Sequence, residues 1–156
     1  MYDLQTLYVR QGNYVAAAKL EIKRDLGRTT KEQMKVPASP DFAGDWKVYE
    51  PDTVGIDGNN LHLRIKNAAP HRLKIDIEAV GTDEKVSDPN AAGHFDNAAV
   101  AQVVWKVRSK WTTIDRQEKA AIVRIGRFLV WFIPDNLHPT GCPSCCVLTR
   151  NESEVK

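Results

Sequence analysis

The stretch that decides the fold is Leu61-His62-Leu63-Arg64-Ile65-Lys66, in which apolar residues alternate strictly with His, Arg and Lys. Successive side chains of a β-strand point to opposite faces of the sheet, so this alternation predicts a strand with one buried and one solvated face. Residues 72–79 repeat the pattern after the turn-forming sequence Asn67-Ala68-Ala69-Pro70. The two segments therefore predict a pair of antiparallel strands joined by a short connection.

Further segments with strand character follow toward the C-terminus. Residues 101–107 alternate in the same way, and residues 145–150 predict a short final strand. Residues 120–133 predict one long strand, whose apolar phase slips at Gly126 and so indicates a bulge or a sharp coil. The stretch 81–97 is polar and contains proline and glycine, which predicts a long loop with one short strand.

The roughly six or seven predicted strands have short connections, and no helix alternates with them. The pattern therefore argues against a parallel α/β sheet and predicts a mainly β fold. The edge strands of an open sheet expose unpaired backbone N–H and C=O groups. Antiparallel strands of this number avoid or limit such edges by closing into a barrel or by stacking as two sheets. We predict an antiparallel meander closed into a small barrel, with a β-sandwich as the alternative.

The N-terminal part of the chain has a helical pattern instead. Asn13 is a suitable N-cap, Gly27 stands where a C-cap glycine would, and apolar residues recur between them at helical spacing. The sequence Pro37-Ala38-Ser39-Pro40 breaks this pattern. We therefore predict an N-terminal helical segment over residues 1–40 and an antiparallel β-barrel domain over residues 41–156.

Length, charge and hydropathy argue against several classes of function. The chain has 156 residues, enough for one domain with its own core, and its net charge is only +2, with basic residues spread along the sequence. We therefore expect no nucleic-acid partner. No run approaches the roughly 18 apolar residues that a membrane-spanning helix needs. Residues 1–5 lack the pattern of a secretory signal, so we expect a cytosolic protein or a mature form whose signal is missing.

Three cysteines lie together at Cys142, Cys145 and Cys146. The spacing of Cys142 and Cys145 suits either a thiol–disulfide couple or half of a zinc site. His138 would be a third zinc ligand, but Cys146 adjoins Cys145 too closely to be the fourth, and the motif leads into a strand rather than a helix. We therefore predict no catalytic residues, no metal and no cofactor. An enzyme that depends on this cysteine pair ranks behind the two hypotheses below.

Two short motifs stand at the ends of the β-rich region. The first is Phe42-Ala43-Gly44-Asp45-Trp46-Lys47-Val48, and the second is Val147-Leu148-Thr149-Arg150. A Gly-x-Trp at the first strand and an Arg at the end of the last strand resemble the signature of the lipocalins and their calycin relatives. The resemblance implies a barrel whose closed end is formed by Trp46 and Arg150, with the guanidinium over the indole ring. By residue, the resemblance covers these two motifs only. The Asp-Tyr pair that the family carries between its sixth and seventh strands is missing, unless Ile125-Gly126-Arg127-Phe128 is a degenerate version of it.

These features predict a non-enzymatic binding protein that holds a small hydrophobic or amphipathic ligand inside the barrel. Small closed barrels either fill their interior with side chains or enclose one ligand. The residues expected to line the interior and bind the ligand are Val103, Trp105, Phe128 and Trp131, whereas the strand phase places Arg124 on the outer face. A hydrophobic small molecule is therefore the expected partner.

The alternative is a structural or assembly subunit of the virion or phage type, built as a β-sandwich. Leu4, Leu7, Tyr8 and Tyr14 make the N-terminal segment rich in large apolar side chains. Such a segment would contact a neighbouring protomer, so this hypothesis predicts a homo-oligomer.

Overall fold

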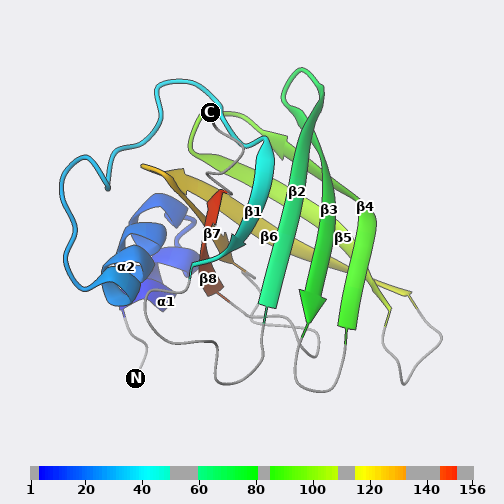
Figure 1. The fold of residues 1–156 in the computed structure, drawn as a ribbon, viewed down its shortest axis with the longest axis horizontal. Coiled ribbons are helices and arrows are strands. Elements are labelled where there is room, and N and C mark those ends of the chain that lie inside the picture. The colour runs from blue at the N-terminus through cyan, green and yellow to red at the C-terminus, as the bar shows by residue number, and fades with distance from the viewer. Residues whose placement is uncertain (1–3, 50–59, 81–84, 109–114, 133–144, 151–156) are drawn as a thin grey trace.

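The described residues of the chain form a closed antiparallel β-barrel preceded by the helices α1 and α2 (Figure 1). The computed structural model describes residues 4–49, 60–80, 85–108, 115–132 and 145–150. Each strand pairs with the next along the chain, and the last strand pairs with the first, so the strands form one closed sheet. The elements are α1 (Leu4–Arg10), α2 (Tyr14–Leu26), β1 (Gly44–Val48), β2 (Asn60–Ala69), β3 (Arg72–Val80), β4 (Lys85–Phe95), β5 (Val100–Arg108), β6 (Asp115–Ile125), β7 (Phe128–Phe132) and β8 (Cys145–Arg150).

The alternating sequence pattern explains why these segments become strands of a barrel. In β2 the side chains of Leu61, Leu63 and Ile65 are buried, whereas those of Arg64 and Lys66 are exposed. β3 and β5 repeat this arrangement, with one apolar face turned to the barrel interior. The predicted mainly β fold and the closed barrel are therefore confirmed, and the sandwich alternative is wrong.

The second helix has the ends that the sequence predicts. The carboxamide oxygen of Asn13 accepts a hydrogen bond from the N–H of Ala16 at 3.3 Å, which caps the start of α2. Gly27 follows α2 with a φ of 77°, and its N–H donates to the carbonyl of Lys23 at 2.8 Å. α2 packs against β6, β7 and β8 on the outside of the barrel (Figure 1). Within the described ranges, no helix is long and apolar enough to cross a membrane.

Buried apolar side chains form two clusters, one on each side of the barrel wall. The interior cluster lies inside the barrel, and the outer cluster joins α2 to the outside of β6, β7 and β8. This explains the continuous apolar sequence of β7, whose two faces are both buried. The outer cluster consists of Ala17, Ala18, Ile22, Ala121, Val123, Ile125, Phe128, Val130, Phe132 and Val147.

The prediction of a long loop over residues 81–97 is wrong, because most of this stretch forms β4. The register between β3 and β4 shifts between Ile75 and Ile77, where Pro89 and Asn90 of β4 face a single residue of β3. This is a β-bulge, and the proline within it cannot donate a ladder hydrogen bond. The bulge allows a strand to form from a sequence that lacks strict alternation.

The side chain of Asp88 compensates for the irregular backbone at this bulge. Its carboxylate accepts one hydrogen bond from the N–H of Asn90 at 2.9 Å and another from the N–H of Lys106 in β5 at 2.7 Å. Asp88 is buried, and a buried N–H left without a partner would cost about 1–3 kcal/mol. An acidic residue that the pattern assigns to a loop thus completes a strand pairing.

The predicted long strand over residues 120–133 is two strands joined by a tight turn. β6 ends at Ile125 and β7 begins at Phe128, and these two residues pair directly across the hairpin. Gly126 has a φ of 55°, a conformation that residues with a side chain rarely adopt, so glycine makes this two-residue turn possible. The slip in the apolar pattern therefore marks a hairpin turn and not a bulge.

Candidate functional site

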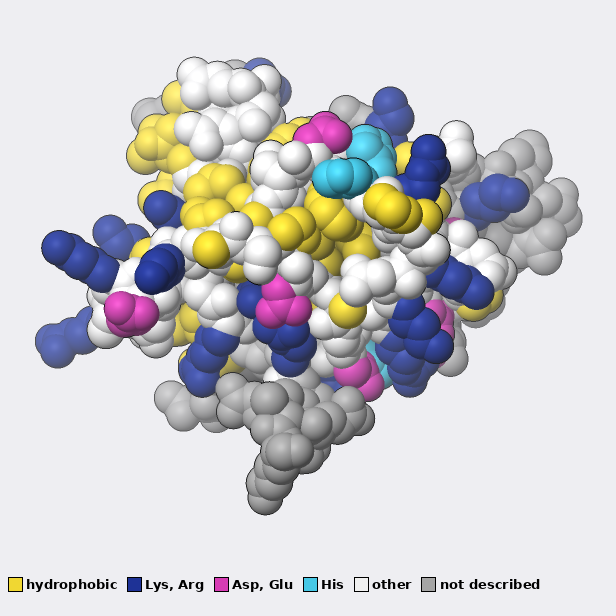
Figure 2. Space-filling view, turned by 90° about the horizontal axis from the view of Figure 1, so that it is seen from above, with side chains coloured by type: hydrophobic (Ala, Val, Ile, Leu, Met, Phe, Trp, Pro, Cys, Tyr) yellow, Lys and Arg dark blue, Asp and Glu magenta, His cyan; other side chains and the backbone are white. Residues whose placement is uncertain are grey.

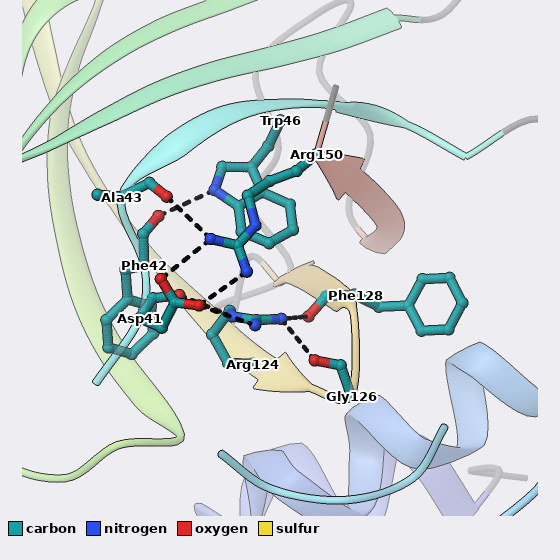
Figure 3. A network of polar contacts seen from close by, with 8 residues as sticks. All are labelled: Asp41, Phe42, Ala43, Trp46, Arg124, Gly126, Phe128 and Arg150. Carbon is teal, nitrogen blue, oxygen red and sulfur yellow. Dashed lines mark hydrogen bonds and ion pairs between the residues drawn. The ribbon is translucent and has the colours of Figure 1, made fainter. Parts of the chain in front are cut away.

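Trp46 and Arg150 meet at one end of the barrel, which we call the closed end (Figure 3). Trp46 is fully buried, and its indole N–H donates to the carbonyl of Phe42 at 2.9 Å. The guanidinium carbon of Arg150 lies 4.7 Å from the centroid of the indole ring, which is within cation–π range. This is the arrangement that the resemblance implies. Figure 2 looks onto the closed end, where hydrophobic side chains gather near the centre with histidine and charged side chains beside them.

Arg150 also joins the last strand to the segment that enters the first strand. Its guanidinium donates two hydrogen bonds to the carboxylate of Asp41, at 3.0 and 2.8 Å, and one to the carbonyl of Ala43 at 3.3 Å. Bidentate pairs of this kind are strong charge-assisted hydrogen bonds. The hydrogen bonds from Arg150 lower the pKa of the Asp41 carboxyl below its ordinary value, and the nearby charge of Arg124 adds to this lowering.

A second arginine, Arg124, lies beside the same ring, with its guanidinium carbon 5.0 Å from the centroid of Trp46. Its Nε donates to the carbonyl of Asp41 at 2.7 Å. Its Nη1 donates to the carbonyls of Gly126 and Phe128 at 3.0 and 2.7 Å (Figure 3). Arg124 therefore ties the β6–β7 hairpin to the chain that enters β1.

The expectation that Arg124 faces outward is wrong, because its side chain is buried at 3% exposure and contacts the ring of Trp46. Burial lowers the pKa of its guanidinium, and the neighbouring charge of Arg150 lowers it further. An arginine nevertheless keeps its charge at neutral pH. A buried cation is tolerated here because backbone carbonyls and the carboxylate of Asp41 surround it.

Gly44 gives Arg150 the space to lie on the ring. Its φ is 143°, and a Cβ atom at this position would lie 2.8 Å from Cδ of Arg150. The glycine of the Gly-x-Trp motif is therefore required both by the backbone conformation and by the side-chain contact. The closed end is thus a structural site, in which the polar groups of the two arginines bond to the protein itself.

The predicted ligand-binding residues do not all lie together. Val103, Trp105 and Trp131 belong to the interior cluster and are buried. Phe128 belongs to the outer cluster, because it pairs with Ile125 across the hairpin and shares its outward face. The placement of Phe128 inside the barrel is therefore corrected.

Trp105 and Trp131 form the aromatic part of the candidate site. Their ring centroids are 5.7 Å apart and their planes are inclined by 75°, an edge-to-face contact. They lie toward the end of the barrel opposite to the closed end, where β5 and β7 finish and β6 and β8 begin. Cys146 at the start of β8 pairs with Trp131 and packs against the interior cluster.

The indole N–H of Trp105 is a buried polar group that no described part of the fold uses. Trp105 is 1% exposed, and its Nε1 has no hydrogen-bond partner among the residues that the structure describes. A buried indole N–H usually finds a partner, as that of Trp46 does. Leaving such a donor unsatisfied costs about 1–3 kcal/mol. An acceptor atom of a bound molecule would remove this cost.

Glu118 lies directly opposite Trp105 in the register of β5 and β6, and it is 7% exposed. It shares its side of β6 with Ala120 and Ile122, which both belong to the interior cluster. The candidate site therefore combines a donor from Trp105 with an acceptor from Glu118. Glu118 does not stand out in the sequence because it lies at the polar start of a strand. Its spacing of two residues from Ala120 is the signal that places it on the interior face.

The predicted cysteine pair lies largely outside the described residues. Cys142 and His138 are not among them, and Cys145 is described through its backbone, which pairs with Phe132. Over the ranges that the structure does describe, no three His, Cys, Asp or Glu side chains lie close enough together to hold a metal ion.

Comparison of the chain with protein families, with curated proteins and with solved structures found no match. The closed antiparallel barrel that the described strands β1 to β8 form is compatible with a lipocalin-like fold. The evidence for a function therefore comes from the geometry of this chain, and above all from the polar groups inside the barrel.

Proposed function

We propose that this protein is a lipocalin-like, non-enzymatic binding protein that holds a small hydrophobic or amphipathic molecule inside its barrel. The observation that carries the proposal is the buried indole N–H of Trp105, which has no partner in the described part of the chain. Native proteins rarely leave such a donor unpaired. A ligand atom that accepts a hydrogen bond would complete the site.

The side chains around this donor support the proposal. Ligand sites are lined mainly by apolar and aromatic side chains with a few polar groups that fix orientation. Trp131 supplies a second aromatic ring next to Trp105. Val103 pairs with Gly93 in β4 and with Ala120 in β6, so the wall beside the two rings carries small residues. Such a surface favours an apolar molecule with one polar group.

Titration of the protein with retinoids, bilins, fatty acids and fatty alcohols tests the proposal. We expect saturable changes in tryptophan emission, because Trp105 and Trp131 would contact the ligand. Trp105→Phe keeps an aromatic ring but loses the N–H, so it should bind about fivefold to tenfold more weakly by calorimetry. Phe128→Leu is the matched control, since this side chain lies in the outer cluster, and it should bind as the wild type does. Flat titrations by both methods for every ligand class would contradict the proposal.

A second candidate function, assembly into a homo-oligomer, is favoured by the surface of α1. Leu4 and Leu7 are 51% and 43% exposed, and their spacing of three residues places them on the same side of the helix. Light scattering at high protein concentration tests this function. A discrete oligomer that Leu4→Ser and Leu7→Ser convert to a monomer would support it, whereas a monomer at every concentration would rule it out.

A further inference from the structure

We infer that the barrel selects an alcohol, an apolar molecule whose hydroxyl group lies between Trp105 and Glu118. This inference rests on the proposed binding function, because it names the chemical class of ligand for the same site. It starts from two buried residues with polar side-chain groups, which are direct register partners in β5 and β6.

The two residues are neighbours on one wall of the barrel. Trp105 and Glu118 are direct register partners on the interior face of the barrel wall. The Cβ atoms of such partners lie about 4.5–5.5 Å apart. Both residues are more than nine-tenths buried, so bulk water has little contact with either side chain.

The two side chains have complementary hydrogen-bonding capacities. The indole N–H of Trp105 is only a donor, and an ionised carboxylate is only an acceptor. A hydroxyl group has one donor and two acceptor positions, so it can accept from Trp105 and donate to Glu118 at the same time. A carboxylate has about four lone-pair positions. The hydroxyl is therefore compatible with the contact that Glu118 already makes within the protein.

Other head groups satisfy fewer of these requirements. A carboxylate would accept from Trp105, but its charge would lie close to that of Glu118, and like charges repel strongly where water is excluded. An ammonium group would attract Glu118 but cannot accept from Trp105, so the indole donor would stay unpaired. A hydrocarbon satisfies neither side chain.

The apolar part of an alcohol has a continuous surface to contact. The next interior pair toward the closed end is Val103 and Ala120, and the pair after it is Ala101 and Ile122. All four residues belong to the interior cluster, and Trp131 belongs to it as well. This surface favours a hydrocarbon chain or ring over a second polar group.

Calorimetric titration with n-octanol, octanoate, octylamine and octane tests the inference. The wild type should bind n-octanol at least about tenfold more tightly than octanoate, which corresponds to about 1.4 kcal/mol. In Glu118→Gln the repulsion is lost and the carboxamide can donate, so octanoate should bind at least as tightly as n-octanol. Glu78→Gln makes the same charge change on β3, where Glu78 is next to the interior residue Ile77 and so faces outward. This control should keep the preference of the wild type.

Trp105→Phe decides the question if Glu118→Gln does not fold. It should weaken n-octanol binding about fivefold or more while leaving octane binding unchanged, because only the hydroxyl uses the N–H. Octanoate binding as tightly as n-octanol to the wild type overturns the inference but leaves the binding function intact. Octylamine as the tightest ligand overturns it in favour of a cation site. If no octyl ligand binds, the inference fails, and the broader ligand panel shows whether the proposed function fails with it.

Discussion

Arg150 lies on the indole ring of Trp46, and the two residues are also direct partners in the register that closes the barrel. The same pair therefore supplies a backbone pairing between β1 and β8 and a cation–π contact between their side chains. The two segments lie at opposite ends of the β-rich region, so this contact forms only when the whole sheet has closed. Loss of either side chain is expected to destabilise that closure.

Substitution of these two residues measures how strongly they act together. Trp46→Ala removes a large buried side chain and should lower the free energy of unfolding by about 3–5 kcal/mol. Arg150→Ala removes the cation–π contact and the hydrogen bonds to Asp41 and should cost about 1–3 kcal/mol. Because the side chains touch, the double variant should cost less than the sum of the two. Urea unfolding of all four proteins gives these values, and strict additivity would show that the pair does not interact.

Gly44→Ala tests whether the glycine of the motif is required by the contact with Arg150. A Cβ atom at this position would meet Cδ of Arg150 at 2.8 Å, and the φ of 143° disfavours any side chain. We expect Gly44→Ala to lower the free energy of unfolding by about 1–3 kcal/mol, and the backbone conformation accounts for part of this decrease. In an Arg150→Ala background the clash is absent, so the same substitution should cost less. An equal cost in both backgrounds would assign the whole effect to the backbone.

Gly126→Ala tests the β6–β7 hairpin. A Cβ atom here would lie 2.9 Å from the carbonyl carbon of Gln33 and nearer still to its oxygen, and the φ is 55°. We expect a loss of more than about 2 kcal/mol, because backbone crowding adds to a conformational cost of about 1–2 kcal/mol. Gly12→Ala is the control: its φ is 76°, but a Cβ atom there would have no neighbour within 4 Å. Thermal unfolding should show a larger loss of stability for Gly126→Ala than for Gly12→Ala. Similar losses of stability would mean that the backbone around Gln33 shifts at little cost to make room for the methyl group.

The lowered pKa of Asp41 makes part of the stability depend on pH. A carboxyl with a lower pKa in the folded state stabilises the fold above its unfolded pKa, near 3.8, and loses this contribution as the pH falls through the folded pKa. We therefore expect the free energy of unfolding to decrease below about pH 4. Asp41→Asn should flatten this decrease, and Arg150→Ala should also do so because Arg150 is the main cause of the shift. Urea unfolding across the acid range measures the free energy of unfolding as a function of pH. If this pH dependence were the same in Asp41→Asn as in the wild type, Asp41 would not be its source.

The regular parts of the fold could be predicted because their signals are local. β2 and β3 alternate strictly, since one face is buried and the other is solvated. The caps at Asn13 and Gly27 depend on backbone groups within a few residues. The closed end was implied by two short motifs, because the contact of Trp46 with Arg150 needs a particular residue at each position.

The parts that could not be predicted depend on residues far away in the sequence. Asp88 completes the pairing of β4 through Lys106, which lies on another strand. Arg124 is buried because the carbonyl of Asp41, from the segment before β1, accepts its hydrogen bond. The side on which Phe128 lies is set by the turn at residues 126–127, which reverses the chain where the pattern continues a strand. A one-dimensional pattern of apolar residues contains none of these partners.

The seam between β1 and β8 is short. Among the described residues it pairs Trp46 with Arg150, Lys47 with Thr149 and Val48 with Leu148. If this seam opened, the closed sheet would acquire two unpaired edges, and such edges are templates for pairing with other chains. We therefore expect the bidentate bond between Arg150 and Asp41 to protect the protein from aggregation as well as from unfolding. In Arg150→Ala, light scattering should rise on heating before β-structure is lost, because neighbouring molecules can join edge to edge while each barrel is still largely intact.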